Sequence, residues 1–387
     1  MRVIIIGSGI AGLAAAIALR RVGIDATVYE RASKLTEVGA GISLWANAFR
    51  ALDYIGAGAA VRAASLPVNC SEFRTRNGHK FAASFLTESF ERQLETAPFL
   101  AMIHRAKLVA ALSSCLPSDT ARYGFECVGA QTHGSRAVVS FKNGHSDEAD
   151  LVIGADGIRS AIHTELFGLT EPRYAGYTCW RGVCSRPPAV AAGYLGEWWG
   201  RGRRFGITTL QGDQVYWWAT KNEPAGTRAD DERAAVTAAF NGWADPVSAL
   251  IAATPATAVL RNDIVDRPPM RRWASGRLGL IGDAAHPMTP NFGQGGCLAI
   301  EDAAVLARHL SNRPDPESSL REFAAERFPR STAVTKESLR FGWIGQWEGR
   351  TSTWGRDTLF ELFLPLIGSL SLPKYAKFDV GTHRSLS

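Results

Sequence analysis

The amino-terminal segment constrains the fold most, because a strand-like run leads there directly into a glycine-rich turn. Val3–Ile6 is β-branched and apolar, which predicts a buried parallel strand. Gly7-x-Gly9-x-x-Gly12 follows at once, and the Ala- and Leu-rich Leu13–Arg21 predicts a helix. Asp25–Tyr29 predicts a second strand, which Glu30 ends. This order of elements predicts a βαβ unit at the start of an α/β fold.

The glycines of this turn indicate a binding site for a dinucleotide. Gly7 makes the tight turn, Gly9 lets a pyrophosphate approach the backbone, and Gly12 lets helix and strand pack closely. The N-terminus of the helix that follows Ala11 and Gly12 offers unpaired N–H groups and a positive dipole to phosphates. Glu30 follows Gly7 by 23 residues and is placed to accept hydrogen bonds from the adenosine ribose. FAD and NAD share this fingerprint, so the turn alone leaves both open.

Two later segments repeat the pattern of a strand followed by a turn. Ala149–Ile153 predicts a strand, and Gly154-Ala-Asp156-Gly157 leads from it into a helix start with Arg159 and Ser160. Arg277–Ile281 predicts another strand before Gly282-Asp283. The glycine-rich Pro290–Cys297 then feeds a predicted helix over Leu298–Leu310, which is a second anion-binding device. A single long ligand suits these two motifs. Asp283 would bind its polyol part, and the loop Pro290–Cys297 would meet its electron-rich end.

Between these two motifs lies a region with a different pattern. Short aromatic or β-branched runs, separated by Gly, Pro and Asp, predict an antiparallel sheet over Tyr174–Val183, Gly193–Trp199, Arg203–Leu210 and Gln214–Thr220. A hairpin across Asn77-Gly78 is expected to join this sheet. By the two-residue period, Tyr216 and Trp218 share one face, whereas Trp217 points away. The sheet is expected to roof a cavity, since ligand sites favour domain interfaces.

Composition excludes several other classes of protein. The chain of 387 residues is 46% hydrophobic and 21% charged, so it can bury a large core. Its six cysteines form no C-x-x-C pair, which argues against a disulfide framework and a metal site and favours a reducing cytoplasm. The net charge is +6 without a long basic block, which argues against nucleic acid as a partner. The chain contains many more Arg than Lys residues, which fits either a surface that attracts anions or a bias in the base composition of the genome.

Two apolar segments raise the question of a membrane. Val3–Leu19 has no charge and resembles a signal peptide, but the glycine-rich turn explains it better. Leu359–Leu372 is broken by Glu361 and Pro365, which predicts a helix and turn packed on the core, with a membrane-surface contact as the alternative. We therefore expect no stable membrane insertion. His286 and His104 are expected to be structural rather than catalytic.

Taken together, the three motifs resemble those of the single-component (class A) FAD-dependent aromatic monooxygenases, the para-hydroxybenzoate and salicylate hydroxylase type. The resemblance covers roughly residues 1–350. Within the family, Thr178–Gly182, Gly202-x-Arg204 and Gly282–Asp302 are similar to salicylate hydroxylases, zeaxanthin epoxidases, alkylquinolone 3-hydroxylases and urate hydroxylases. Gly345–Glu348 is similar to the quinolone hydroxylases in particular.

The resemblance implies a Rossmann-like FAD-binding domain of the GR2 type with an inserted antiparallel substrate domain and a C-terminal helical segment. The FAD-binding domain is expected at 1–68, 98–175 and 265–345, the substrate domain at 69–97 and 176–264, and the helical tail at 346–387. A monomer or a homodimer fits this organisation equally well.

The resemblance also implies which residues bind FAD. The turn residues Gly7, Gly9, Ala11 and Gly12 meet the pyrophosphate, Glu30 the ribose, Arg31 and the Cys127 backbone the adenine, and Arg105 the pyrophosphate. Asp283 meets the ribityl and diphosphate region, and the backbone of Gly293, Gly295, Gly296 and Cys297 meets the pyrimidine end of the flavin. The loop Gly39–Ser43, including Ser43, lies on the other side of the flavin, and Asp156 supports these loops and the nicotinamide encounter.

For the substrate side, the resemblance implies that Arg204 and Tyr216 contact the substrate and that the Pro290 carbonyl faces the reacting carbon. Asn291 stands where the urate branch carries an acid. The implied reaction uses NADPH or NADH, FAD and O2 to hydroxylate an aromatic or N-heteroaromatic ring through a C4a-hydroperoxyflavin. An epoxidase, a urate-type hydroxylase and a non-hydroxylating flavin dehydrogenase are the alternatives. An ordinary nicotinamide dehydrogenase would leave Gly282-Asp283 unexplained.

Overall fold

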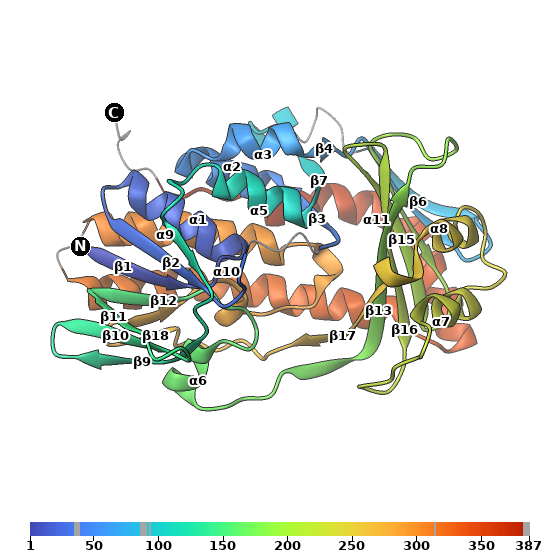
Figure 1. Ribbon diagram of the computed structural model, residues 1–387. Helices are drawn as coiled ribbons and strands as arrows, with labels where there is room; N and C mark the ends of the chain where they lie inside the picture. The colour runs from blue at the N-terminus through green and yellow to red at the C-terminus, as the bar shows by residue number, and fades with distance from the viewer. Residues whose placement is uncertain (35–38, 86–90, 93, 313–314, 382–387) are drawn as a thin grey trace.

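A computed structural model describes residues 1–387 apart from 35–38, 86–90, 93, 313–314 and 382–387. Two large sheets dominate it, and they lie at opposite ends of an elongated molecule (Figure 1). The first sheet has six strands in the order β18-β19-β12-β1-β2-β8. Their bounds are Ala274–Ser275, Leu278–Leu280, Leu151–Gly154, Arg2–Ile6, Asp25–Glu30 and Ala121–Tyr123.

Strand β1 lies in the middle of this sheet and pairs in parallel with β12 and β2. Its residues Val3–Ile6 are all buried because helices and further strands cover the sheet, as a continuous apolar run predicts. Helices α1 (Ile10–Arg21) and α9 (Gly295–Asn312) pack against each other beside it (Figure 1). A three-stranded sheet of β9 (Cys127–His133), β10 (Arg136–Phe141) and β11 (Ser146–Ala149) packs nearby.

Three element boundaries differ from the sequence prediction. The strand expected over Ala149–Ile153 is divided, because β11 pairs with β10 whereas β12 begins at Leu151 and pairs with β1. Asp150 makes the change of partner, with its N–H bonded to the Arg2 carbonyl at 2.9 Å. Helices α1 and α9 also begin earlier than predicted, inside the glycine turns, because close packing there outweighs the poor helix propensity of Gly.

The second sheet has seven strands in the order β17-β13-β16-β15-β14-β5-β6. Their bounds are Leu260–Asp266, Arg173–Ser185, Gln214–Asn222, Arg203–Leu210, Tyr194–Trp199, Cys70–Thr75 and Lys80–Phe85. The predicted hairpin of β5 and β6 does join this sheet. It does so through a parallel pair with β14, so the sheet is mixed rather than purely antiparallel. The hairpin comes from a distant part of the chain, so no tight turn fixes its direction relative to β14.

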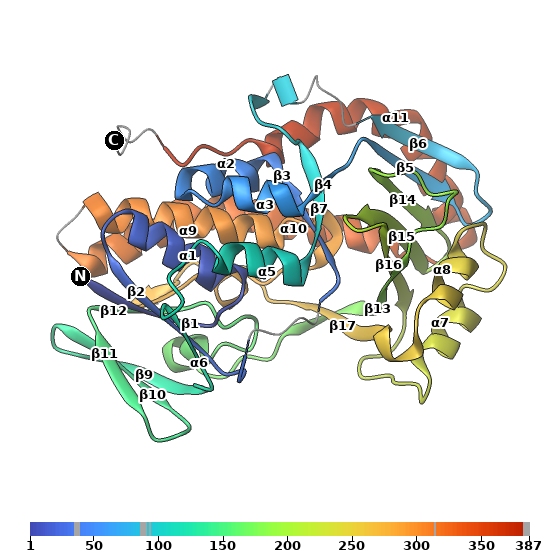
Figure 2. The same cartoon turned by 45° about the horizontal axis from the view of Figure 1, so that its top comes forward.

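The two faces of the seven-stranded sheet have different neighbours. One face buries Trp180, Trp198 and Trp217 against helices α7 (Glu232–Ala239) and α8 (Val247–Ala253). The opposite face carries Tyr216 and Trp218, and it packs toward the part of the molecule that holds the six-stranded sheet (Figure 2). The alternation predicted for Tyr216, Trp217 and Trp218 is therefore confirmed. We call this second face of the sheet, which also carries Arg204, the inner face.

A small sheet and several helices connect the two ends. Strands β3 (Gly41–Trp45), β7 (Leu100–His104) and β4 (Leu66–Pro67) form this sheet in the order β3-β7-β4. Helices α2 (Ala46–Ile55), α3 (Gly58–Ala64) and α5 (Arg105–Ser113) pack around it, and α6 (Ala161–Phe167) lies beside β12. Short 3-10 turns cover Ala256–Ala258, Gly282–Ala284 and Pro290–Phe292.

Two long helices complete the chain. Helix α10 (Pro316–Gly345) runs beside α9, and α11 (Arg350–Ala376) runs along β6 (Figure 2). The prediction of a helix and a turn over Leu359–Leu372 is wrong, since α11 continues through Pro365. A proline removes one helical hydrogen bond, and ring contacts such as Phe360 with Trp199 hold the helix on the sheet. Within the described part of the chain, no helix has the length and apolarity that a membrane span needs.

Candidate active site

The three turn motifs lie next to one another because they follow neighbouring parallel strands. The Ala155 N–H donates to the Ile6 carbonyl at 2.8 Å, and the Ile281 N–H donates to the Gly154 carbonyl at 3.0 Å. The Gly7 N–H donates to the Tyr29 carbonyl at 2.8 Å, which joins the end of β2 to the same edge. Ligands of open α/β sheets bind at the carboxyl ends of their strands. These four chain segments therefore define one candidate cofactor groove.

The backbone of the first turn fits a pyrophosphate. A Cβ on Gly7 would lie 2.6 Å from the Ala155 carbonyl oxygen, and a Cβ on Gly12 would lie 1.9 Å from the Gly7 carbonyl oxygen. These two glycines are needed for packing. A Cβ on Gly9 would meet nothing within 4 Å, so this glycine leaves open space over the helix N-terminus. Ala11 packs against Gly282, where a Cβ would lie 2.9 Å from the Ala11 methyl group.

The residues assigned to the adenosine half lie along β2 and β9. The Glu30 carboxylate accepts hydrogen bonds from the Ser8 N–H at 2.8 Å and from the Ala32 N–H at 2.9 Å, so it is held at the end of β2 beside the glycine turn. Arg31 is exposed next to it. Burial raises the pKa of Cys127 to about 12, which keeps its thiol neutral. This agrees with a contact through the Cys127 backbone rather than its sulfur.

Asp156 lies at the end of β12 with one carboxylate oxygen still available. Its Oδ2 accepts from the Ala161 N–H at 2.8 Å and so caps the start of α6. Its Oδ1 is buried and has no hydrogen-bond partner in the described part of the chain. Burial raises the pKa of this carboxyl group above its ordinary value. The same loop packs on Gly7, so Asp156 supports the glycine turn directly.

Asp283 reaches solvent in the groove although protein atoms surround much of its side chain. Desolvation raises the pKa of Asp283, while the nearby positive charges of His286 and Arg105 act in the opposite direction. Arg105 is exposed at the start of α5, where the His104 ring accepts the Ala106 N–H at 3.3 Å. The groove thus brings the predicted Asp283 and Arg105 within electrostatic reach of each other.

A buried ion network holds Gly282-Asp283 from behind. The Asp302 Oδ2 accepts from the Gly282 N–H at 2.9 Å and lies 2.6 Å from the His286 Nε2. Its Oδ1 accepts from the Arg327 Nε at 2.7 Å, and Arg327 also pairs with Glu301 at 2.7 Å. His286 is therefore part of the network that supports Gly282-Asp283.

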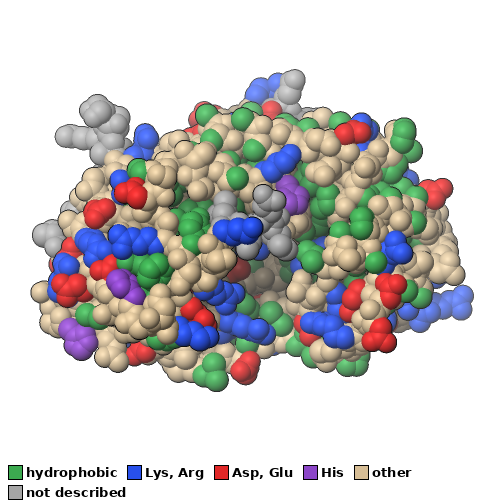
Figure 3. All heavy atoms as spheres, viewed as in Figure 1, with side chains coloured by type: hydrophobic (Ala, Val, Ile, Leu, Met, Phe, Trp, Pro, Cys, Tyr) green, Lys and Arg blue, Asp and Glu red, His purple; other side chains and the backbone are tan. Residues whose placement is uncertain are grey.

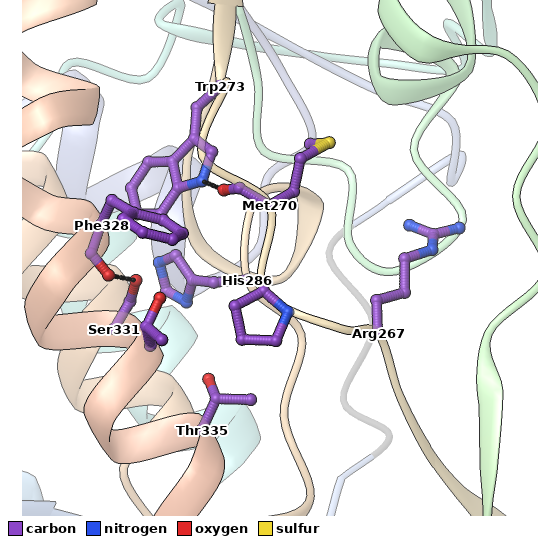
Figure 4. A pocket seen from close by; sticks show the side chains of 9 residues that line it. Arg267, Met270, Trp273, His286, Phe328, Ser331 and Thr335 are labelled. Atoms are coloured by element: carbon purple, nitrogen blue, oxygen red, sulfur yellow. Dashed lines mark hydrogen bonds between the residues drawn. The ribbon is translucent and has the colours of Figure 1, made fainter.

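A narrow cleft opens beside His286. It is lined by His286, Trp273, Phe328 and Thr335, among other residues (Figure 4). The cleft lies between the loop of Arg267–Trp273 and α10. Asp283, Arg204 and Tyr216 do not line it. The cleft is therefore separate from the candidate active site.

The second glycine-rich loop is tied to β3. Ser43 donates from its Oγ to the Gly293 carbonyl at 3.0 Å, and the Asn47 side chain donates to the buried Gln294 side chain at 2.9 Å. A Cβ on Gly296 would lie 2.8 Å from the Ile42 side chain. Ser43 and Ile42 of β3 are therefore in direct contact with the run Gly293–Cys297. Gly295 and Gly296 open helix α9, where backbone N–H groups lack helical partners.

Arg204 lies on the inner face and is enclosed by polar partners. Its Nε donates to the Gln346 Oε1 at 2.9 Å, its Nη2 to the Asn291 Oδ1 at 2.7 Å, and its Nη1 lies 3.2 Å from the Glu197 Oε1. Only 3% of the residue is exposed. Arg204 thus joins the seven-stranded sheet, the glycine-rich loop and the C-terminal segment in one network.

Pro290 directly precedes Asn291 of this network, whereas Tyr216 lies on the same inner face, four residues before Thr220, which pairs with Arg204. A Cβ on Gly41 would lie 2.3 Å from the Tyr216 ring, so the ring rests directly on β3. Burial raises the pKa of Tyr216 to about 12, and its hydroxyl stays neutral. Pro290 is exposed and opens the 3-10 turn in which its carbonyl accepts the Gly293 N–H at 2.9 Å. A carbonyl oxygen has a second lone pair, which remains available to a ligand.

Between the two lobes the surface is hollowed, and basic side chains gather around the hollow (Figure 3). The fold and its motifs thus define a protein with a dinucleotide-type groove beside an aromatic sheet. A family model described as FAD binding domain matches residues 1–338. The chain belongs to this family.

Named relatives support the assignment. The chain is 39% identical over 363 residues to aurachin C monooxygenase/isomerase of Stigmatella aurantiaca, with 94% of each chain covered. It is 35% identical over 337 residues to FAD-dependent urate hydroxylase of Klebsiella pneumoniae, covering 85% of this chain and 86% of the relative. The crystal structure of Klebsiella pneumoniae HpxO complexed with FAD and uric acid matches with a TM-score of 0.91 at 29% identity, covering 97% and 96% of the chains. These findings confirm the resemblance predicted from the sequence.

Several residues of the site escaped the sequence analysis. Glu197 carries no motif of its own, and Gln346 lies within Gly345–Glu348 without an expected partner, although both bind Arg204. Asp302 and Arg327 lie within helical patterns that look like ordinary amphipathic helices. The available signal was a charged residue at a helix position that the pattern expects to be buried. Charged residues are rarely buried unless they are paired, so such a position indicates an ion pair.

Proposed function

We propose that this protein is a FAD-dependent monooxygenase that consumes NADPH or NADH and hydroxylates an aromatic or N-heteroaromatic small molecule. The junction of the two lobes carries the proposal. There, the glycine-rich loop reaches the inner face through Asn291 and Arg204, and β3 reaches it through Gly41 and Tyr216. The end of the cofactor groove therefore meets a polar and aromatic wall.

The residues of the groove fit FAD. In this proposal the pyrophosphate lies over Gly7, Gly9, Ala11 and Gly12 with Arg105 beside it, and Glu30, Arg31 and the Cys127 backbone hold the adenosine. Asp283 holds the ribityl and diphosphate region, and the N–H groups of Gly293, Gly295, Gly296 and Cys297 meet the pyrimidine end, with Ser43 opposite and Asp156 as support. When bound, FAD supplies the redox and oxygen chemistry.

The protein's own residues orient the substrate and exclude water from it. Arg204 retains two N–H groups beyond its three bonds, so it can donate to a ring oxygen or nitrogen without moving. The neutral Tyr216 hydroxyl, on the same inner face, can donate or accept a further hydrogen bond. The Pro290 carbonyl faces the same junction and limits which ring position approaches. Such fixed donors act without reorganisation during the reaction.

An epoxidase is the alternative function. Zeaxanthin epoxidase of Nicotiana plumbaginifolia is 34% identical over 354 residues, and this chain spans 52% of its length. The polar wall around Arg204 favours hydroxylation of a polar ring, because an apolar alkene would leave the two remaining Arg204 N–H groups without acceptors.

Further features of the protein remain part of the proposal. The division into a FAD-binding domain, an inserted sheet domain and a helical tail follows the boundaries given above. A reducing cytoplasm is supported by six free cysteines. The nicotinamide is expected to bind transiently, since the sequence contains one dinucleotide fingerprint. A monomer and a homodimer both fit.

The test begins with the colour of the purified protein and a panel of ring compounds. We expect a yellow protein whose NADPH oxidation rises with at least one salicylate-like acid, quinolone, hydroxypyridine or urate, and whose product gains one oxygen atom. If no ring compound raised oxidation above the basal rate, the hydroxylase proposal would fail.

Two variants separate the cofactor side from the substrate side. Asp283→Ala should lose FAD, and a normally yellow variant would contradict the role given to Asp283. Arg204→Ala should raise KM while the flavin content stays normal. Unchanged Michaelis constants would make Arg204 a purely structural residue.

A further inference from the structure

The end of helix α10 lies directly against the polar network of Arg204. Ser338, Gly342, Gly345 and Gln346 lie against this network. Their spacing of four, three and one residues places them on one side of α10 and of its C-cap. We call these four residues the α10 face. Gln346 reaches the network with its side chain, Ser338 reaches it with its main-chain carbonyl, and the two glycines present bare backbone.

The α10 face fixes the orientation of the Asn291 amide. The Asn291 Nδ2 donates to the Ser338 carbonyl at 2.9 Å, and a carbonyl can only accept. The Asn291 Oδ1 therefore points the other way, where it accepts from the Arg204 Nη2 at 2.7 Å. The Nδ2 also donates to the Tyr177 hydroxyl and to the Thr289 Oγ1, each at 3.0 Å. Asn291 thus presents a neutral acceptor to Arg204 and cannot flip without losing the bond to Ser338.

The two glycines leave the room that this arrangement needs. A Cβ on Gly342 would collide with the Asn291 Nδ2 and would lie 3.0 Å from the Tyr177 hydroxyl oxygen. A Cβ on Gly345 would lie 2.9 Å from the Arg204 Cδ and 3.0 Å from its Nε. Asn291 and Arg204 are each held by at least three hydrogen bonds, so neither can move aside freely. A methyl group at either glycine would therefore displace one of them and disturb the network.

Asn291 and Arg204 belong to different sides of the proposed site. Asn291 follows Pro290 in the 3-10 turn that ends at Gly293, so a shift of Asn291 also moves the loop assigned to the flavin. A shift of Arg204 moves the N–H groups assigned to the substrate. Because the α10 face touches both side chains, it sets how the substrate wall and the flavin loop lie relative to each other.

We propose that Gly342 and Gly345 are positioning residues, which act through Asn291 and Arg204 and set where the ring of the substrate lies relative to the flavin. The inference rests on the proposed function, because it concerns the orientation of a substrate at the same junction. It gives the end of α10 a part in the reaction, although neither glycine needs to touch the substrate. A small displacement of an orienting group is enough to lower the rate of a reaction that depends on geometry.

A double-mutant cycle between Gly342 and Asn291 tests the proposal. The FAD-loaded wild type, Gly342→Ala, Asn291→Ala and the double variant are compared with salicylate, 4-hydroxyquinoline, 3-hydroxypyridine and urate as ring compounds. The measurements are KM, kcat, flavin content and the fraction of consumed NADPH that appears as hydroxylated product. A second cycle with Asn291→Ser uses a milder change at the same position.

Two single variants complete the set. Gly345→Ala probes the contact with Arg204. Gly355→Ala is the matched control, because a Cβ on this glycine of α11 would meet nothing within 4 Å.

We expect Gly342→Ala to raise KM about tenfold and to lower the product fraction at normal flavin content, because the displaced network no longer holds the ring in place. In the Asn291→Ala background, Gly342→Ala should change KM less than about twofold, since the side chain with which the methyl group collides is gone. Gly345→Ala should act in the same direction as Gly342→Ala, and Gly355→Ala should behave as wild type.

Additive effects of Gly342→Ala and Asn291→Ala would overturn the proposal. It would equally be overturned if Gly342→Ala lowered only the flavin content or the unfolding midpoint while KM and the product fraction stayed at wild-type values, because that result describes a purely structural glycine. Failure of the proposed function has a separate signature, in which no ring compound stimulates NADPH oxidation by wild type. The cycle is then read from the urea midpoints of the four apoproteins, where additive shifts would contradict the coupling of Gly342 to Asn291.

Discussion

Asp302→Asn removes one negative charge from the buried network behind Gly282-Asp283 and leaves the size of the side chain almost unchanged. Asp302 receives three contacts, from the Gly282 N–H at 2.9 Å, the His286 Nε2 at 2.6 Å and the Arg327 Nε at 2.7 Å. An asparagine has one acceptor oxygen, so its NH2 group must face one of these donors. Arg327 would then lose part of its compensation in a site without solvent.

Two arguments give the magnitude of this effect. Removing one partner of a buried ion pair costs about 3–5 kcal/mol. Desolvation of Asp302 opposes ionisation, but His286 and Arg327 outweigh it and lower its pKa from 3.8 to about 2. That shift corresponds to about 2 kcal/mol, since one pKa unit equals about 1.4 kcal/mol. We therefore expect a loss of about 2–4 kcal/mol in the free energy of unfolding.

The pH dependence follows from the sign of the shift. Because the pKa of Asp302 is lower in the folded state than in the unfolded state, its contribution is complete above about pH 4 and is lost as the pH falls toward 2. The difference between wild type and Asp302→Asn should therefore be largest near neutral pH and shrink on acidification.

The assay is urea unfolding of the apoprotein, combined with a titration of FAD into each variant. Asp302→Asn should also bind FAD more weakly, because the Gly282 N–H loses its charged acceptor. Asp213→Asn is the control, since Asp213 pairs with Arg186 at 2.6 Å in the turn before β16, and its side chain is 69% exposed. It should cost less than about 1 kcal/mol. Equal unfolding midpoints and FAD affinities for wild type and Asp302→Asn would refute the reasoning.

Two other substitutions probe the junction of the lobes. Gly41→Ala places a Cβ 2.3 Å from the Tyr216 ring, so we expect a raised KM at near-normal flavin content and a loss of about 1–3 kcal/mol in the free energy of unfolding. The control is Gly355→Ala, whose Cβ meets nothing within 4 Å and which should be neutral. Equal KM values for the two variants would contradict the contact between Gly41 and Tyr216. Gln346→Leu removes the oxygen that accepts hydrogen bonds from the Arg204 Nε and the Thr220 Oγ1. In thermal or urea unfolding, it should lower the free energy of unfolding by about 1–3 kcal/mol. An unchanged unfolding midpoint would mean that the C-terminal segment does not stabilise the seven-stranded sheet.

Much of the cofactor groove could be predicted from the sequence because its signals are local. A β-branched run followed by Gly7, Gly9 and Gly12 has few structural solutions, and the same holds for the turn at Gly282. The alternation of Tyr216, Trp217 and Trp218 likewise needed only the geometry of a strand. These features were found where the sequence predicted them.

The rest depends on contacts between distant segments. Glu197, Asn291 and Gln346 meet at Arg204 from three different elements, and no local pattern indicates their partner. The parallel pairing of β5 with β14 and the continuation of α11 through Pro365 are also set by tertiary packing.

The most direct test of the central claim is the fate of molecular oxygen. The purified protein, loaded with FAD and supplied with NADPH, would turn over a ring substrate from the panel under an atmosphere of isotopically labelled O2. We predict a product that carries one labelled oxygen atom on its ring. A product without label, or substrate oxidation that proceeds equally well without O2, would contradict the assignment as a monooxygenase.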